Sequence, residues 1–115
     1  MNERLRQRLE DVRDEAHFAL DLVVRHGEAV PHDLIFRKAL ERACELAGEA
    51  LRAMVVHDPE IANAYPDLPW REAIGLRTKL AHGYSSIDPV QLVGTVRAHF
   101  PDLIRQVDAI LGDAP

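Results

Sequence analysis

Residues 34–56 read LIFRKALERACELAGEALRAMVV, and this stretch decides the fold class of the chain. Its apolar residues recur every three or four positions, which is the spacing of one face of an α-helix. Small residues recur among them, so a second helix can approach this one closely. We expect the helix to begin after Asp33, a good N-cap residue, and to end at His57-Asp58-Pro59, because proline disfavours a helical residue before it. The apolar stripe consists of Ile35, Leu40, Ala43, Ala47, Leu51, Met54 and Val55.

A similar apolar stripe precedes this segment. Residues 2–26 predict a long helix, and Gly27 directly after them is a natural stop signal. The narrow, heptad-like spacing of the stripe favours packing against other long helices. Its members are Leu5, Leu9, Val12, Ala16, Ala19 and Val23.

Two further helices are expected in the second half of the chain. Pro69 suits the first turn of a helix from Trp70 to about Ala81, because its missing N–H is not needed there. The dipeptide Asp88-Pro89 is a second start signal. The stripe that follows continues across Pro101, which predicts one helix kinked at that proline. This stripe comprises Val90, Val93, Val96, Phe100, Leu103, Val107 and Ile110.

The pattern as a whole predicts an all-α protein, a helical bundle of about four main helices. No useful length of the sequence alternates polar and apolar residues as a strand does. Residues 60–68 are the least regular stretch and are expected to form a connection. A chain of 115 residues suits one domain, residues 1–115.

Charge and composition narrow the function. The formal net charge of −5, from 14 Lys and Arg against 19 Asp and Glu, excludes a generally basic nucleic-acid coat but allows a small basic site. No signal peptide and no apolar run near the ~20 residues of a membrane span are visible, so we expect a soluble, cytoplasmic protein.

Several kinds of site find no support in the sequence. Glycine-rich phosphate loops, cysteine pairs and His-Glu-x-x-His are not present, and Asp14-x-x-His17 occurs only once, so we expect no metal and no cofactor. The single cysteine, Cys44, cannot form an internal disulfide. It lies among small apolar residues in a predicted helix and is expected to be a buried, inert thiol.

One cluster has the residue types of phosphodiester chemistry. Arg77, Lys79, His82 and Tyr84 lie within eight residues of this acidic chain. Arginine binds phosphate oxygens, histidine exchanges protons near neutral pH, and tyrosine stacks on a base or binds phosphate. The alternative is a solvated face with an exposed Arg77, a capping His82 and a packed Tyr84.

The spacing of this cluster poses a geometric problem. Five residues rotate by about 140° on an ideal helix, so Arg77 and His82 do not share a face. They converge if the long arginine reaches round, if the last turn unwinds, or if a second subunit supplies part of the site.

Three segments of the sequence resemble the HepT-like HEPN family: residues 65–72 (YPDLPWRE), residues 75–84 (GLRTKLAHGY) and Ile87-Asp88. The family pattern is an arginine, four residues, a histidine, one residue and a tyrosine. Ala47-Gly48-Glu49-Ala50 also resembles a turn of the second helix in this family. Its members are ribonuclease toxins of two-gene modules, whose antitoxin is a small MNT-type nucleotidyltransferase, MntA.

The resemblance implies a HEPN-type bundle and a metal-independent endoribonuclease that acts as a homodimer with both motifs facing one cleft. It implies that His82 is the general base or acid and that Arg77 stabilises charge on the phosphate. Tyr84 would be the residue that the MntA-like partner modifies with AMP, which would exclude RNA.

The residues around the motif fit this scheme with one departure. Lys79 and Arg71 would contact or support the RNA. Thr78 stands where the family usually has asparagine directly after the motif arginine. This departure keeps open a non-catalytic HEPN module that binds a nucleotidyltransferase or nucleic acid, and a plain structural or metal-binding bundle is the third alternative.

Overall fold

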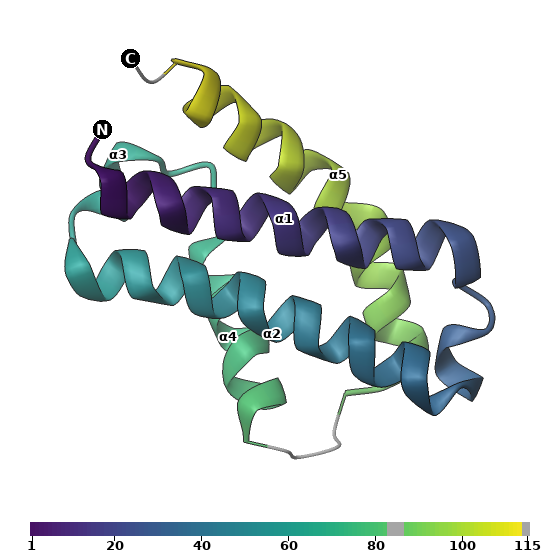
Figure 1. Ribbon diagram of the computed structural model, residues 1–115. Helices are drawn as coiled ribbons and strands as arrows, with labels where there is room; N and C mark the ends of the chain where they lie inside the picture. The colour runs from purple at the N-terminus through teal and green to yellow at the C-terminus, as the bar shows by residue number, and fades with distance from the viewer. Residues whose placement is uncertain (83–86, 114–115) are drawn as a thin grey trace.

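Every regular element in the described part of the chain, residues 1–82 and 87–113 of the computed structural model, is helical (Figure 1). The predicted all-α bundle is confirmed, with four long helices and two short helical segments in these ranges. In chain order they are α1 (Glu3–His26), the 3₁₀ turn η1 (Val30–His32), α2 (Leu34–His57), α3 (Ile61–Ala64), α4 (Trp70–Ala81) and α5 (Pro89–Asp113).

Side-chain caps fix where α1, α2 and α5 begin. Asn2 accepts a hydrogen bond from the Leu5 amide at 2.7 Å, and Asp33 accepts one from the Phe36 amide at 3.0 Å. Each cap satisfies a backbone N–H that has no partner inside its helix. The predicted caps are therefore confirmed at Asp33 and also at Asp88, whose side chain accepts a hydrogen bond from the Val90 amide at 2.9 Å.

The core lies where α1 packs against α2 and α5, while α4 packs on the opposite side of α2. The stripe predicted for α1 is buried from Leu9 to Val23. The prediction that Ile35 and Val90 lie on the buried face is wrong, because their side chains are 78% and 62% exposed. Both lie in the first turn of their helices, at the edge of the packed part of the bundle.

The structure confirms one local prediction and corrects two. Gly27 directly follows α1, as predicted, in right-handed backbone (φ −46°). The short helix α3 lies within residues 60–68, which carry too few apolar residues to show a helical period. Pro69 occupies the N-cap of α4 and not its first turn.

The helix α5 continues through Pro101, as the unbroken apolar stripe predicts. Proline lacks the N–H that would bond to the carbonyl one turn earlier, which weakens the helix on that side. Figure 1 shows α5 changing direction partway along its length. No helix in the described ranges has the length and apolar character needed to cross a membrane.

The helices α2 and α4 approach each other closely at Gly48. A Cβ at this position would lie 2.5 Å from the Arg77 Cβ and 2.6 Å from the Ala73 carbonyl oxygen. Real side chains do not tolerate such distances, so only glycine permits this helix crossing. The small residues noted in the sequence thus place α4, and with it Arg77, directly against α2.

Gly48→Ala tests this packing, with Gly75→Ala as its matched control. Alanine favours helix by up to about 1 kcal/mol over glycine, so propensity alone predicts that both variants are more stable. Gly75 has nothing within 4 Å of an added Cβ, and its variant is expected to gain stability. Gly48→Ala is expected to lose about 1–3 kcal/mol by overpacking. Urea unfolding measures both free energies, and a stabilised Gly48→Ala contradicts the packing described here.

Candidate active site

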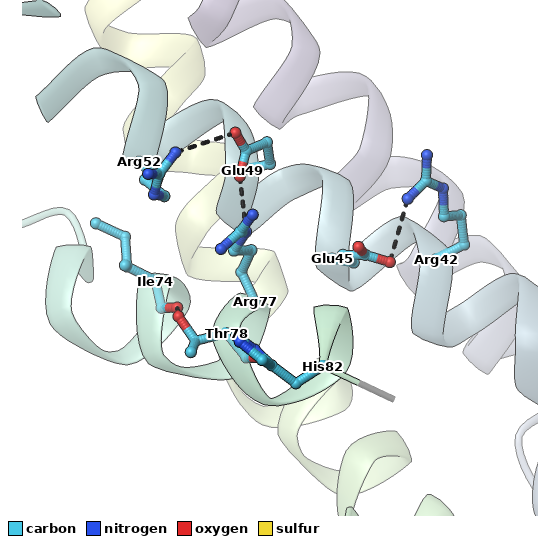
Figure 2. A network of polar contacts seen from close by, with 8 residues as sticks. All are labelled: Arg42, Glu45, Glu49, Arg52, Ile74, Arg77, Thr78 and His82. Atoms are coloured by element: carbon cyan, nitrogen blue, oxygen red, sulfur yellow. Dashed lines mark hydrogen bonds and ion pairs between the residues drawn. The ribbon is translucent and has the colours of Figure 1, made fainter. Parts of the chain in front are cut away.

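The helix crossing at Gly48 brings Arg77 of α4 against Glu49 of α2 (Figure 2). Arg77 Nε lies 2.7 Å from Glu49 Oε2, and the two side chains are 25% and 38% exposed. Both facing atoms are buried, and their orientation makes the contact an ion pair without hydrogen-bond geometry. The expectation that Arg77 is an exposed surface residue is therefore wrong.

Glu49 also contacts a second arginine. Its Oε1 lies 3.5 Å from Arg52 Nη1, three residues along α2. One carboxylate thus lies between two guanidinium groups and holds Arg77 in a defined position. The pair to Arg77 uses Nε, and the other four N–H donors of a guanidinium are on its two Nη nitrogens, the atoms that bind phosphate oxygens in pairs.

His82 ends α4 and turns its ring back onto the helix. Its Nδ1 lies 2.7 Å from the Thr78 carbonyl oxygen. A carbonyl oxygen only accepts, so Nδ1–H is the donor in this bond. The neutral ring therefore has its lone pair on Nε2, and the hydrogen bond fixes both the tautomer and the ring orientation.

Thr78 supports this arrangement through its backbone. Its carbonyl accepts the bond from His82, while its hydroxyl donates to the Ile74 carbonyl at 3.0 Å. Hydroxyl bonds to the preceding turn are common for threonine within helices. The hydroxyl donor of Thr78 is thus directed along α4, whereas the longer asparagine of the family pattern reaches farther.

The predicted site residues fall into separate groups. Figure 2 shows Arg77 pointing toward Glu49 and His82 lying against Thr78, so the two motif residues do not point toward one another within this chain. Lys79 and Arg71 are exposed on α4. Tyr84 lies outside the described residues.

Sequence reasoning missed Glu49 and Arg52 as members of the site. Glu49 is part of the segment that resembles the family, but nothing in α2 itself shows what it contacts. The available signal is Gly48, because a glycine inside a helix often marks the close approach of another backbone. The residue beside such a glycine is then a candidate contact.

Other chemistry finds no support around this site. Cys44 is buried, and burial together with the nearby charge of Glu41 raises the pKa of its thiol to about 12. The prediction of a buried thiol is confirmed, and at neutral pH it stays protonated and unreactive. Within the described residues, no group of three or more His, Cys, Asp and Glu side chains is placed to hold a metal ion.

Comparison with known proteins shows the family. The family described as Ribonuclease HepT-like matches residues 7–110. This chain belongs to the HepT-like ribonuclease family. The expectation drawn from Arg77, His82 and the flanking segments is thus confirmed at the level of the family.

Several relatives support this assignment of the HepT-like chain. It is 31% identical over 89% of its length to "Putative RNase MJ1380" of Methanocaldococcus jannaschii, covering 88% of that protein. It is 29% identical over 90% of its length to "Putative RNase TTE0752" of Caldanaerobacter subterraneus, covering 90% of that protein. "Probable ribonuclease HepT" of Thermococcus cleftensis is 35% identical over 56% of each chain. No solved structure matches significantly.

The ion pair between Arg77 and Glu49 is testable by a double-mutant cycle on the HepT-like protein. Glu49→Gln, Arg77→Gln and the double variant are expected to give a coupling energy of about 1–2 kcal/mol. This value lies between those typical of exposed and of buried ion pairs. The exposed pair of Asp102 and Arg105 is the control and should give less than about 0.5 kcal/mol. Equal coupling in the two cycles contradicts a holding role for Glu49.

Proposed function

We propose that this chain is a metal-independent endoribonuclease, the toxin of a two-gene HEPN/MNT module, formed by one HEPN domain over residues 1–115. Membership of the HepT-like ribonuclease family supports this reading. The single observation that carries it is the orientation of His82, whose Nδ1–H bond to the Thr78 carbonyl leaves Nε2 as the basic nitrogen. A general base needs a lone pair on a defined atom at neutral pH.

The proposed reaction is a transfer within the RNA backbone. His82 Nε2 takes the proton of a ribose 2′-hydroxyl, whose oxygen attacks the adjacent phosphorus. The bond from phosphorus to the 5′-oxygen breaks, and a second histidine, in its imidazolium form, gives that leaving oxygen a proton. Arg77 stabilises the charge that develops on the phosphate oxygens.

A homodimer supplies the second histidine. Arg77 and His82 point apart within one chain, so a complete site needs groups from two copies. In the monomer α4 packs on α2, and α5 packs on α1. Between α4 and α5 runs a groove of about 640 Å³, lined by apolar residues that include Leu68, Leu76, Phe100 and Leu103. We place the dimer contact on these two helices, with both motifs facing one cleft.

Cleavage of single-stranded RNA in the presence of EDTA tests the proposal. The wild type is expected to cut, and His82→Ala to lose at least about 100-fold in rate, the usual effect of removing a general acid or base. His17→Ala removes an exposed histidine of α1 and should cut at the wild-type rate. Equal cutting by His82→Ala, or loss of cutting with EDTA, contradicts the mechanism.

The composite site is tested with the same assay. A covalently linked dimer with His82→Ala in one copy keeps only one of the two histidines. It is expected to lose at least about 100-fold in rate, because either the base or the acid is missing, and a linked dimer of two wild-type copies is the control. Sedimentation of the wild type as a monomer at all concentrations contradicts the dimer.

We further propose that a nucleotidyltransferase antitoxin inactivates the toxin by modifying Tyr84, and that Lys79, Thr78 and Arg71 contact or support the RNA. In this step the Tyr84 hydroxyl oxygen loses its proton to solvent and bonds to the α-phosphorus of ATP. The bond from that phosphorus to the oxygen shared with the β-phosphorus breaks, and pyrophosphate leaves. Tyr84 follows His82 by two residues in the sequence. The added phosphate would occupy donors that otherwise bind RNA phosphate.

Tyr84→Phe tests the modification. This variant lacks the acceptor oxygen but keeps the ring, so it should cut RNA and resist inactivation by the partner with ATP and magnesium. Intact-mass spectrometry is expected to show one added AMP on the wild type and none on Tyr84→Phe. An equal mass increase in both proteins contradicts Tyr84 as the acceptor and favours inhibition by occlusion.

Thr78 supports a second candidate, a non-catalytic HEPN module that binds a nucleotidyltransferase. Its hydroxyl donates to the Ile74 carbonyl within α4, whereas the usual asparagine carries an amide that extends farther. A protein that binds the partner and leaves RNA intact in the EDTA assay supports this candidate. If Thr78→Asn then cuts RNA, threonine at this position is the reason that the wild type does not.

A further inference from the structure

A second basic site lies at the end of the bundle where α1 begins and α2 ends. A pocket of about 630 Å³ is lined there by Arg4, Arg8, Arg52 and His57. Asp58 contributes the one carboxylate among its lining residues. Three arginines against one carboxylate stand out in a chain whose net charge is −5. The composition of this pocket is therefore that of an anion-binding site.

The contacts inside the pocket support this reading. Arg4 Nη1 lies 3.2 Å from His57 Nδ1, and a guanidinium only donates, so His57 accepts and is neutral in this contact. The Asp58 carboxylate accepts a hydrogen bond from the Glu60 amide at 3.1 Å, at the end of α2. No ion pair in the described structure joins Asp58 to an arginine of the pocket.

Two arginines of the pocket make only long, exposed ion pairs. Arg8 lies 3.9 Å from Asp11, and Arg52 lies 3.5 Å from Glu49, with all four side chains more than a third exposed. Exposed pairs of this kind contribute about 0–1 kcal/mol and exchange readily with other partners. A phosphate group can therefore compete for these guanidinium groups.

Arg52 links the pocket to the candidate active site. Arg52 lines the pocket and also contacts Glu49, which holds Arg77. Glu49 and His57 are eight residues apart on α2, which corresponds to about 12 Å along the helix axis. At about 3.4 Å for each nucleotide of a stacked strand, this length corresponds to three or four nucleotides.

We propose that this pocket binds the backbone phosphates of the single-stranded RNA a few nucleotides away from the bond that is cut. The inference rests on the proposed ribonuclease function and adds a substrate-binding site to it. Arg4 and Arg8 approach the phosphate oxygens from α1, and Arg52 from α2. Guanidinium groups are suited to this because their paired N–H donors match the spacing of phosphate oxygens. The pocket fixes the direction of the strand across α2 and contributes affinity without taking part in the reaction.

RNA binding by charge-matched double variants tests the site. Arg4→Gln/Arg8→Gln removes two charges from the pocket, and Arg25→Gln/Lys38→Gln removes two exposed charges from the opposite end of the α1–α2 pair. Both are made in His82→Ala, so the labelled single-stranded RNA stays intact. Fluorescence anisotropy is expected to show a roughly tenfold weaker affinity for the pocket variant and a change within about twofold for the control.

Salt dependence and kinetics give independent readouts. Loss of two phosphate contacts should reduce the slope of log affinity against log salt by about 1.4. In the protein with His82 intact, the pocket variant is expected to raise KM with kcat nearly unchanged, because uniform binding is lost. Arg8→Gln alone keeps the contact between Arg4 and His57 and should lose roughly threefold in affinity, which separates binding from any effect on folding.

The outcomes distinguish this site from the proposed function. Equal affinity and equal salt slopes for the two double variants overturn the site, while cutting that depends on His82 leaves the ribonuclease proposal intact. Wild-type protein that neither binds nor cuts RNA overturns both. If the pocket variant loses the nucleotidyltransferase and keeps full RNA binding, the pocket is a protein-binding surface and the inference is wrong.

Discussion

The contact between α2 and α4 at Gly48 is the constraint on which the candidate site depends. α4 makes its main packing contact with α2, and the missing Cβ of Gly48 lets the Cβ of Arg77 come within contact distance of the α2 backbone. Only at this separation does the Arg77 guanidinium reach Glu49. The position of the one arginine that the proposed chemistry requires is thus set by the absence of a side chain on another helix.

The beginning of α4 is fixed by a different kind of interaction. Trp70 is its one buried residue in the structure, and the indole Nε1–H donates to the Tyr65 carbonyl at 2.8 Å. A buried indole needs a partner for its N–H, and here the partner lies in the segment before the helix. The segment from Tyr65 to Trp70 therefore orients α4, while Gly48 sets its distance from α2.

Much of the fold could be predicted from the sequence, because long helices carry their own period. The stripes of α1, α2 and α5, the caps at Asp33 and Asp88, and the unbroken helix through Pro101 all follow from local patterns. The single-turn α3 and the exposure of Ile35 could not be predicted, because each depends on how the other helices pack against that segment. A stripe indicates that a face is apolar and not how far along the helix its partner extends.

The candidate site was harder to predict for the same reason. The spacing of Arg77 and His82 and the rotation between them were evident from the sequence, and the structure shows the two side chains pointing apart. The partners of these residues come from elsewhere. Glu49 lies 28 positions before Arg77, and neither the ion pair nor the basic pocket at the ends of α1 and α2 has a local signature. Such contacts arise only when helices are placed in three dimensions.

The length of α4 has a consequence for the dynamics of the molecule. A helix of 12 residues is marginal by itself in water. In α4 only Trp70 is fully buried, while Ala73, Ile74, Leu76 and Leu80 pack partly buried against the core. Its helical state therefore depends on docking to α2, its main packing partner. Undocking of α4 alone would separate Arg77 from Glu49 while most of the core stays folded. The position of the candidate catalytic residues therefore depends on how stably α4 docks on α2.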